Sequence, residues 1–243
     1  MNIYYVNILS AICCLVGGYF FGAIPNGVLI GKIFFHKDPR DFGSGNSGGT
    51  NSGRVLGKRI GFLVIVLDML KAVIPVIGAW AVMTFTPLHD CYVFGTWDLS
   101  SLYYWLAGLA AVIGHCWPVY IKFKGGKAVA CFMGLAVFTS WFFLLVCAVY
   151  IGTLKAKKMV SLASIVGGLF QVIAAWSVYL VGQLTDFDIH NFMWTFALGN
   201  QAVSCGLWYA IVMTISYGII VIRHRSNIER IKEGNENRIT WLK

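Results

Sequence analysis

Uncharged runs alternate with short charged stretches along the whole chain. The runs cover Met1 to Gly31, Ala72 to His89, Leu99 to Ile121, Ala128 to Leu154, Ser161 to Thr185 and Ile189 to Ile222. The second run begins earlier, near Ile60, because only Asp68 and Lys71 interrupt it. A helix of about 20 apolar residues crosses about 30 Å of hydrocarbon, and most of these runs reach that length. The pattern predicts an all-α, polytopic integral membrane protein.

The charged residues predict which side of the membrane each connection faces. Eighteen of the nineteen Lys and Arg residues fall in four stretches, Lys32 to Arg59, Lys122 to Lys127, Lys155 to Lys158 and Arg223 to Lys243. The two remaining connections carry only acidic charges, at Asp90, Asp98, Asp186 and Asp188. The positive-inside rule places the basic stretches in the cytoplasm and the acidic loops outside. The N-terminus is then outside and the C-terminus cytoplasmic.

This orientation requires the run from Ala128 to Leu154 to enter the membrane and return. Lys127 and Lys155 flank the run, and both are predicted to lie inside. We expect two short helices bent near Thr139 and Ser140, or a re-entrant pair buried against other helices. Counting both halves gives about seven membrane segments. No linker or soluble domain is evident, so residues 1–243 are expected to form a single membrane-embedded domain.

The amino-acid composition excludes most classes of soluble protein. Of the 243 residues, 58% are hydrophobic and 12% are charged, whereas soluble domains average about 25% charged residues. The formal charge of +9 therefore indicates membrane orientation more than nucleic-acid binding. The first 31 residues carry no charge and are too long for a signal peptide, so they predict a first transmembrane helix. Six of the seven cysteines lie in or beside apolar runs, and no disulfide framework is expected.

A glycine-rich loop, GSGNSGGTNSGR, extends from Gly43 to Arg54. Glycines allow positive φ, so successive backbone amides can form an anion-binding nest, with hydroxyls and Arg54 as further donors. A solvated turn is the alternative interpretation. The loop also contains the spacing of a dinucleotide fingerprint, which we discard because that motif requires a preceding strand. A His-x4-Asp pair, His36 and Asp41, could combine a histidine base with an orienting carboxylate, but Pro39 interrupts it and we interpret it as a coincidence.

Two further basic stretches could bind anions. Gly125 and Gly126 precede Lys127, which opens a helix-like run, and a helix N-terminus behind such a turn favours a phosphate. The lysines could instead only set topology or meet anionic lipid. In the tail, His224 and Asn227 share a face if the helix continues, although basic residues after a final span are also ordinary positive-inside charges.

Three isolated polar residues are given structural interpretations. Asp68 and Lys71, three apart in an apolar helix, are expected to form an ion pair that faces the bundle interior, with a supporting role near the loop as the alternative. His115 lies near the end of an apolar run and is interpreted as a packing or helix-end residue. Paired small residues, Gly18 with Gly22 and Gly27 with Gly31, would allow close helix packing.

Three motifs taken in order resemble the PlsY family of bacterial acyl-phosphate:glycerol-3-phosphate acyltransferases. The first loop matches GSGNxGxTNxxR, the second stretch GGKGVATxxG and the tail HRxNIxRxxxGxE; LDxxKA from Leu67 and SLASI from Ser161 are also similar. The likeness extends from about Gly22 to Glu236. Three positions depart from the pattern: Ser47 stands where proline is common, Ala128 where glycine is usual and Cys131 where threonine is usual.

The resemblance implies transfer of a fatty acyl group from acyl phosphate to the 1-hydroxyl of sn-glycerol 3-phosphate, which gives lysophosphatidic acid and inorganic phosphate. It also implies seven helices and a cytoplasmic-facing site in the bacterial cytoplasmic membrane. The catalytic residues that it implies are Ser44, Arg54, Lys127, His224 and Asn227. The expected substrate- and phosphate-binding residues are Gly43, Gly45, Asn46, Thr50, Asn51, Gly125, Gly126 and Arg223.

Acyl phosphate is a mixed anhydride with a stable leaving group, so neither a cofactor nor a metal is expected. Positioning and charge compensation can suffice. Either His224 or a phosphate oxygen of the substrate could take the hydroxyl proton, and we favour the substrate oxygen. Expected partners are the two substrates and membrane lipids, with no nucleic acid; a transient contact with a soluble enzyme that makes acyl phosphate is allowed. The alternatives are a transporter of phosphate or organophosphate anions and a non-catalytic membrane anchor.

Overall fold

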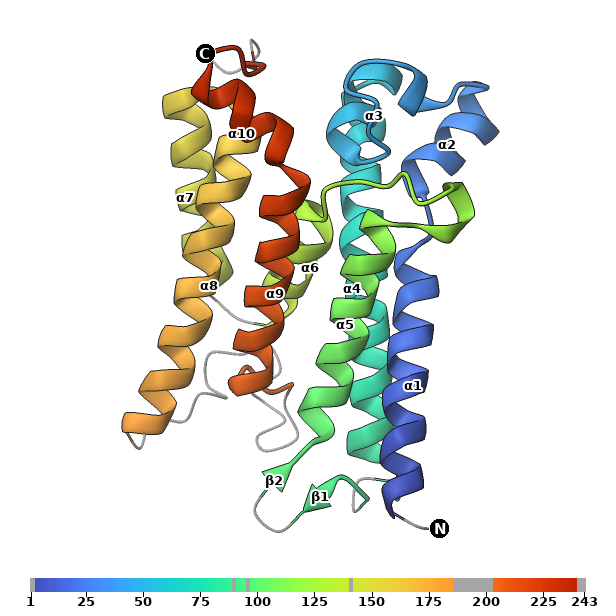
Figure 1. Cartoon of the computed structure of the whole chain (residues 1–243), viewed down its shortest axis with the longest axis vertical. Coiled ribbons are helices and arrows are strands. Elements are labelled where there is room, and N and C mark those ends of the chain that lie inside the picture. Colours follow the sequence, from blue (N-terminus) through green and yellow to red (C-terminus); the bar gives the residue numbers. More distant parts are fainter. Residues whose placement is uncertain (1–2, 89–90, 95–96, 140–141, 186–202, 240–243) are drawn as a thin grey trace. The chain divides into compact units, whose positions relative to one another are not determined.

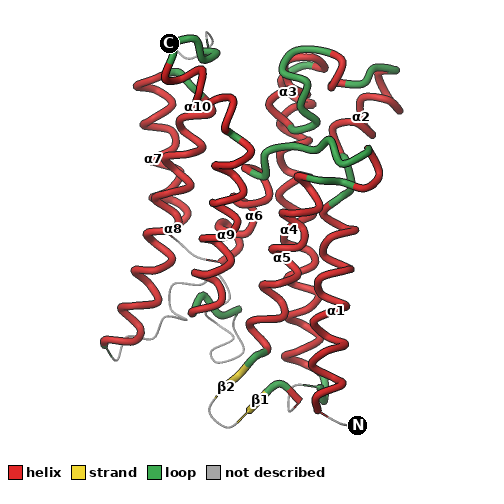
Figure 2. The backbone as a smooth tube through the Cα atoms, viewed as in Figure 1, coloured by secondary structure: helices red, strands yellow, loops and turns green. Residues whose placement is uncertain are grey.

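The computed structural model describes residues 3–88, 91–94, 97–139, 142–185 and 203–239. These residues form two compact units, Met1–Leu135 and Ala136–Lys243. Regular structure in the described residues is almost entirely helical, with one short antiparallel hairpin between β1 (Val93–Phe94) and β2 (Trp97–Asp98) (Figures 1 and 2). The predicted all-helical membrane architecture is thus confirmed in outline.

The first unit contains three long helices and a set of short polar elements. The long helices are α1 (Ile3–Gly22), α4 (Lys58–Phe85) and α5 (Ser100–Cys116). Between α1 and α4 lie α2 (Asn26–Phe35), the 3-10 turn η1 (Pro39–Asp41) and α3 (Gly49–Leu56). The turn η3 (Val119–Ile121) follows α5, and α6 (Val129–Thr139) begins in this unit and ends in the second. The polar elements gather at one end of the three long helices (Figure 1).

Helix α1 packs directly on the backbone of α5. A Cβ atom at Gly18 would collide with the carbonyl of Ala107, and one at Gly22 would collide with the backbone of Ala111. The close approach is reciprocal, because Gly114 of α5 lies against the carbonyl of Tyr19. Gly18 and Gly22 therefore do what small residues in membrane helices were expected to do, and the absence of side chains lets the two backbones touch.

The second unit is built from antiparallel and bent helices. Helix α7 (Phe142–Lys157) packs along α8 (Val160–Leu184), and α8 packs on α9 (Leu207–Arg223). The short α10 (Arg225–Lys232) continues from α9 after a bend of 59° and contacts α8. One continuous helix was the condition for a shared face of His224 and Asn227, and it is not met, because the bend between α9 and α10 falls at His224.

Within the described residues, four segments are long and apolar enough to span a membrane, or five if α9 and α10 form one broken span. They begin at Ile3, Lys58, Ser100 and Val160, close to four of the predicted runs. The run from Ala128 to Leu154 consists of two helices, α6 and α7, as predicted. The proposed bend residue Ser140 lies outside the described residues, as do Asp90, Asp186, Asp188 and the start of the last run.

The contact between α1 and α5 predicts a selective effect of alanine. Gly22→Ala should lower the free energy of unfolding by about 1–3 kcal/mol, because its methyl group meets the α5 backbone, which cannot give way as a side chain can. Thermal unfolding in detergent measures the effect. Gly17→Ala is the matched control, since the space beside Gly17 is open and alanine is the better helix former. Equal melting temperatures for the two variants would contradict the prediction.

Candidate active site

The first motif, residues 43–54, folds into a loop that leads into α3, and it is organised around the side chain of Asn51. This side chain is 1% exposed. Its Oδ1 atom accepts hydrogen bonds from the backbone N–H of Ser44 (2.8 Å) and from the Ser44 hydroxyl (3.1 Å). Its Nδ2 atom donates to the carbonyls of Pro39 (2.7 Å), Asn46 (2.9 Å) and Phe42 (3.2 Å). One buried carboxamide thus fixes the path of the whole loop.

Most of the loop residues that were expected to meet phosphate are accessible, but Asn51 is not, because its side chain is buried within the loop. Gly43 and Gly45 have φ values of 63° and 69°, the left-handed conformation that glycine adopts without strain. Ser44, between them, is exposed, and so are Thr50 at the start of α3 and Arg54 in its last turn. Asn46 is half-buried and donates weakly to Ser44, at 3.3 Å. Two of the five glycines of the motif thus have the positive φ expected of an anion-binding nest, although the Ser44 amide between them is bonded to Asn51. Anion binding by this loop stays a prediction.

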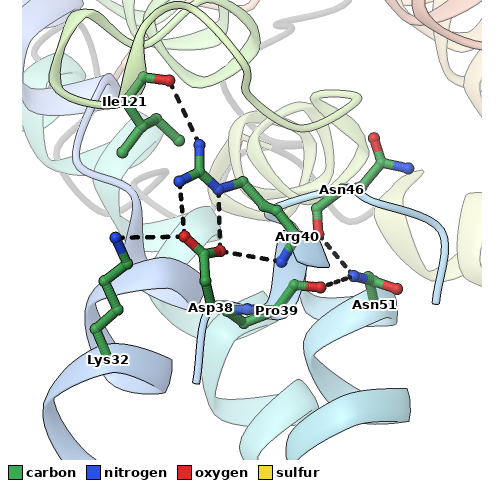
Figure 3. A network of polar contacts seen from close by, with 7 residues as sticks. All are labelled: Lys32, Asp38, Pro39, Arg40, Asn46, Asn51 and Ile121. Atoms are coloured by element: carbon green, nitrogen blue, oxygen red, sulfur yellow. Dashed lines mark hydrogen bonds and ion pairs between the residues drawn. The ribbon is translucent and has the colours of Figure 1, made fainter. Parts of the chain in front are cut away.

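An ion pair at Asp38 joins this loop to its surroundings. Arg40 donates through Nε (3.0 Å) and Nη2 (2.7 Å) to the Asp38 carboxylate, and the Lys32 ammonium lies 3.4 Å from it (Figure 3). The hydrogen bond from Arg40 outweighs burial and lowers the pKa of Asp38 to about 2, so the carboxylate is charged at neutral pH. Arg40 Nη1 also donates to the carbonyl of Ile121 at 3.4 Å. The arginine thereby connects the first loop to the segment that leads to the second motif.

The second motif forms a turn, Gly125–Lys127, that is packed against the end of α5. Gly125 and Gly126 are both buried, whereas Lys127 is half-buried. The N–H of Gly126 donates to the carbonyl of His115 at 3.1 Å. A Cβ atom at Gly126 would collide with the His115 ring, and one at Gly125 would collide with the His115 carbonyl. The helix α6 begins two residues after Lys127, as the sequence predicted.

The departures from the family pattern have different structural settings. Ala128 is fully buried and has a φ of 63°, a left-handed conformation that costs an alanine about 1–2 kcal/mol and glycine almost nothing. Cys131 lies against α4, and its thiol donates to the carbonyl of Asp68 at 3.1 Å, a bond that a threonine hydroxyl can also make. Ser47 is buried with its carbonyl against Gly27. A proline at this position would retain that carbonyl.

The interpretation of Asp68 and Lys71 as a buried ion pair is confirmed. The ammonium of Lys71 lies 3.0 Å from the Asp68 carboxylate, and both side chains are at most 5% exposed. Lys71 also donates to the carbonyl of Ile24 (2.7 Å), and Asn26 donates to Asp68 (3.0 Å). These partners replace the water that both charges lose on burial.

The third motif lies in the second unit, at the bend between α9 and α10. His224 is 3% exposed, and its Nδ1 atom lies 2.8 Å from the carbonyl of Ile220. Because a carbonyl oxygen can only accept, Nδ1 carries the proton in this bond, and in a neutral ring Nε2 is then the nitrogen that can take up a proton. Asn227 is also buried, and Arg223 is half-buried at the end of α9.

Glu236 fixes the position of Asn227. Its carboxylate, 7% exposed in the structure, accepts hydrogen bonds from Asn227 (2.7 Å), Ser161 (2.7 Å) and Arg230 (2.8 Å). Burial by itself raises the pKa of this carboxyl, but the three hydrogen bonds outweigh burial and lower it. The charged Glu236 therefore ties the tail to the start of α8 and holds α10 against it.

Of the predicted site residues, the structure brings those of the first two motifs into one unit and those of the third into the other. The proximity of the third motif to the first two stays a prediction. His36 and Asp41 are exposed, and no hydrogen bond or ion pair joins them in the described part of the chain, in keeping with a coincidental match. Sequence reasoning missed the anchoring roles of Asp38, Arg40 and Glu236. Glu236 is the last residue of the third motif, and this place in the motif is the sequence signal that could have identified its role.

Comparison with known proteins identifies the family. The sequence matches the glycerol-3-phosphate acyltransferase family over residues 12–234. The chain belongs to the glycerol-3-phosphate acyltransferase family. This acyltransferase is 36% identical to the enzyme of that name from Staphylococcus haemolyticus and 38% identical to that from Staphylococcus aureus. Each alignment covers 236 residues, 96% of this chain and 100% of the relative.

Two crystal structures are similar to this acyltransferase. Both are of PlsY (YgiH), described as an integral membrane glycerol 3-phosphate acyltransferase, one in a glycerol 3-phosphate form and one in a lysophosphatidic acid form. Their TM-scores are 0.69 and 0.67, at 30% and 29% identity, over 96% of this chain and 97% of each PlsY chain. The predicted family and the prediction of a membrane enzyme that acylates glycerol 3-phosphate are confirmed.

The Glu236 contacts predict a pH-dependent difference in stability. Glu236→Gln should lower the free energy of unfolding at pH 7 by about 1–3 kcal/mol, because the charged hydrogen bond from Arg230 is lost. A carboxyl whose folded pKa is lowered stabilises fully above its unfolded pKa, and that contribution disappears as the pH falls through the folded value. The two melting curves should therefore converge below about pH 4. A constant difference from pH 7 to the acid limit would contradict this account.

Proposed function

We propose that this acyltransferase uses acyl phosphate as donor and the 1-hydroxyl of glycerol 3-phosphate as acceptor. The products are lysophosphatidic acid and inorganic phosphate. The observation that carries the proposal is the accessible cradle of the first motif, in which two left-handed glycines flank the exposed Ser44 and Arg54 lies exposed in the following helix. A phosphate ester or acyl phosphate is the chemical class that such backbone and cationic groups favour.

The reaction can proceed without a covalent intermediate on the protein. The acceptor hydroxyl attacks the acyl carbonyl carbon. The bond between this carbon and the bridging oxygen of the phosphate breaks, and phosphate leaves with the electron pair. Both substrates are anions, so their mutual repulsion opposes the encounter; Arg54, Lys127 and Arg223 offset it, with the backbone of Gly125 and Gly126 shaping the turn. The Ser44 hydroxyl, which donates to Asn51 Oδ1 at 3.1 Å in this structure, turns to donate to a phosphate or to the developing oxyanion.

The hydroxyl proton goes either to a phosphate oxygen of the substrate or to His224. We favour the substrate oxygen, because no carboxylate in the three motifs is placed as a base. In this scheme His224 orients the acceptor, and Nε2 is the atom that faces the reaction, since Nδ1 is engaged with Ile220. Asn227, held by Glu236, supports the same acceptor through its carboxamide.

The proposed site lies on the cytoplasmic side of the bacterial inner membrane. We place about seven segments in the membrane, formed by α1, α4, α5, α6, α7, α8 and α9, with the N-terminus outside and the C-terminus inside. This arrangement is supported by the four basic stretches, which all fall on one side of it. The two units then act as a single domain, residues 1–243, in which the three motifs meet at the inner leaflet.

A coupled assay tests the reaction. Purified protein in detergent should release phosphate from acyl phosphate only when glycerol 3-phosphate is present. Lys127→Ala should lower kcat/KM by about 100-fold or more, because it removes a cation that offsets the substrate charges. Lys124→Ala, an exposed lysine of the same basic stretch, is the matched control and should retain near-normal turnover. Full activity of the Lys127 variant would remove this residue from the site, and release without acceptor would overturn the transfer reaction.

Accessibility labelling tests the geometry. Single cysteines placed at Arg54, Lys127 and Arg225, the exposed residue beside His224, in a background with the seven native cysteines replaced, should react with a membrane-impermeant thiol reagent only from the cytoplasmic side of inverted vesicles. All three positions should share one side, because the proposed reaction needs their motifs at one leaflet. Labelling of any one of them from the opposite side would contradict the proposed arrangement.

A further inference from the structure

A buried group of polar side chains lies beneath the Gly125–Lys127 turn. It comprises Asn26 of α2, Asp68 and Lys71 of α4, and His115 in the last turn of α5, and we call it the polar cluster. The Asp68 carboxylate is its centre: Lys71 and Asn26 each approach Oδ1 at 3.0 Å, and the Nδ1 atom of His115 lies 3.8 Å from it. None of these four residues belongs to the sites proposed above.

His115 is the member of the polar cluster that touches the turn. Its carbonyl accepts the N–H of Gly126 at 3.1 Å. Its ring lies against the α-carbon of Gly126 so closely that a methyl group there would overlap Nε2, Cε1 and Cδ2. The side chain is 5% exposed, so this contact is made away from solvent. The Gly125–Lys127 turn therefore packs directly on the imidazole ring.

Asp68 is the member of the polar cluster nearest to the ring, with its Oδ1 atom 3.8 Å from Nδ1 of His115, beyond hydrogen-bond distance. Asp68 is 2% exposed and Lys71 is 4% exposed, and a charge at such depth keeps its position because its partners cannot be replaced by water. The backbone of Asp68 also accepts the thiol of Cys131, in the first turn of α6. Asp68 thus lies near α5, which precedes the turn, through His115, and contacts α6, which follows the turn, through Cys131.

We propose that His115 is a positioning residue for phosphate binding by the Gly125–Lys127 turn. The inference rests on the proposed function of the turn, and it assigns to His115 no contact with substrate. The ring fixes the position and orientation of the Gly125–Lys127 backbone, so removal of the ring weakens substrate binding more than it slows the chemical step.

The first test is a separation of KM from kcat. His115→Ala should raise the KM for the substrate whose phosphate the turn binds, glycerol 3-phosphate or acyl phosphate, by about tenfold, while kcat at saturation falls less than about threefold. Glycerol 3-phosphate and a long-chain acyl phosphate are varied separately, and melting temperatures in detergent establish that the variants are folded. A loss of kcat with both KM values unchanged would indicate a structural role and overturn the proposal.

The second test is a double-mutant cycle on the contact itself. Gly126 does not have a left-handed φ, and the three atoms nearest to a Cβ atom there all belong to the His115 ring. Gly126→Ala alone should raise the same KM about tenfold or more. In the His115→Ala background the methyl group has room, and the additional effect of Gly126→Ala should fall below about twofold. Equal effects of Gly126→Ala in both backgrounds would overturn the proposal. If His115→Ala does not fold, His115→Asn, which is also shorter than histidine, takes its place in the cycle.

Two controls separate this inference from the proposed function. Gly17→Ala makes the same chemical change where the space is open, and it should leave both KM values unchanged. Wild-type and Lys127→Ala proteins are assayed alongside: glycerol 3-phosphate-dependent release that is lost with Lys127 supports the proposed site. In that case a failed double-mutant cycle rejects only the role of His115. No release by the wild-type protein rejects the proposed donor reaction instead.

Discussion

The carboxylate of Asp68 is the constraint on which the first unit depends. A charge among apolar helices is tolerated only where other groups replace its hydration, and here these groups come from segments far apart in the chain. Asn26 follows the break between α1 and α2, Lys71 lies one turn along α4, and Cys131 binds the backbone of the same aspartate. Contacts to this one residue, through its carboxylate and its backbone carbonyl, therefore link α2, α4 and α6 at the level where the polar loops begin.

Buried polar side chains also order the loops at this end of the first unit. The carboxamide of Asn51 makes five hydrogen bonds, all to its own loop or to Pro39 beside it, and so leaves the exposed Ser44 hydroxyl and the cation of Arg54 at the surface. Glu236 does the corresponding work in the second unit. In both places a buried polar residue orders the backbone, and its exposed neighbours are left to meet anions.

The sequence predicted helices well and contacts poorly, for physical reasons. Hydropathy is a local property, so the runs and the two-helix division between Ala128 and Leu154 could be found by inspection. The bend at His224 could not, because no proline or glycine marks it and the chain continues to favour helix on both sides. The roles of Asp38 and Glu236 depend on partners brought together by folding. Motif order identified the family, and the orientation of the motifs toward one another stays a prediction.

The contact between α1 and α5 has a consequence for how the protein is made. Gly18 and Gly22 meet a helix that is synthesised only after α4 and the β1–β2 hairpin. Docking of α1 on α5 therefore waits until both α4 and α5 have been synthesised, although α1 precedes them in the chain.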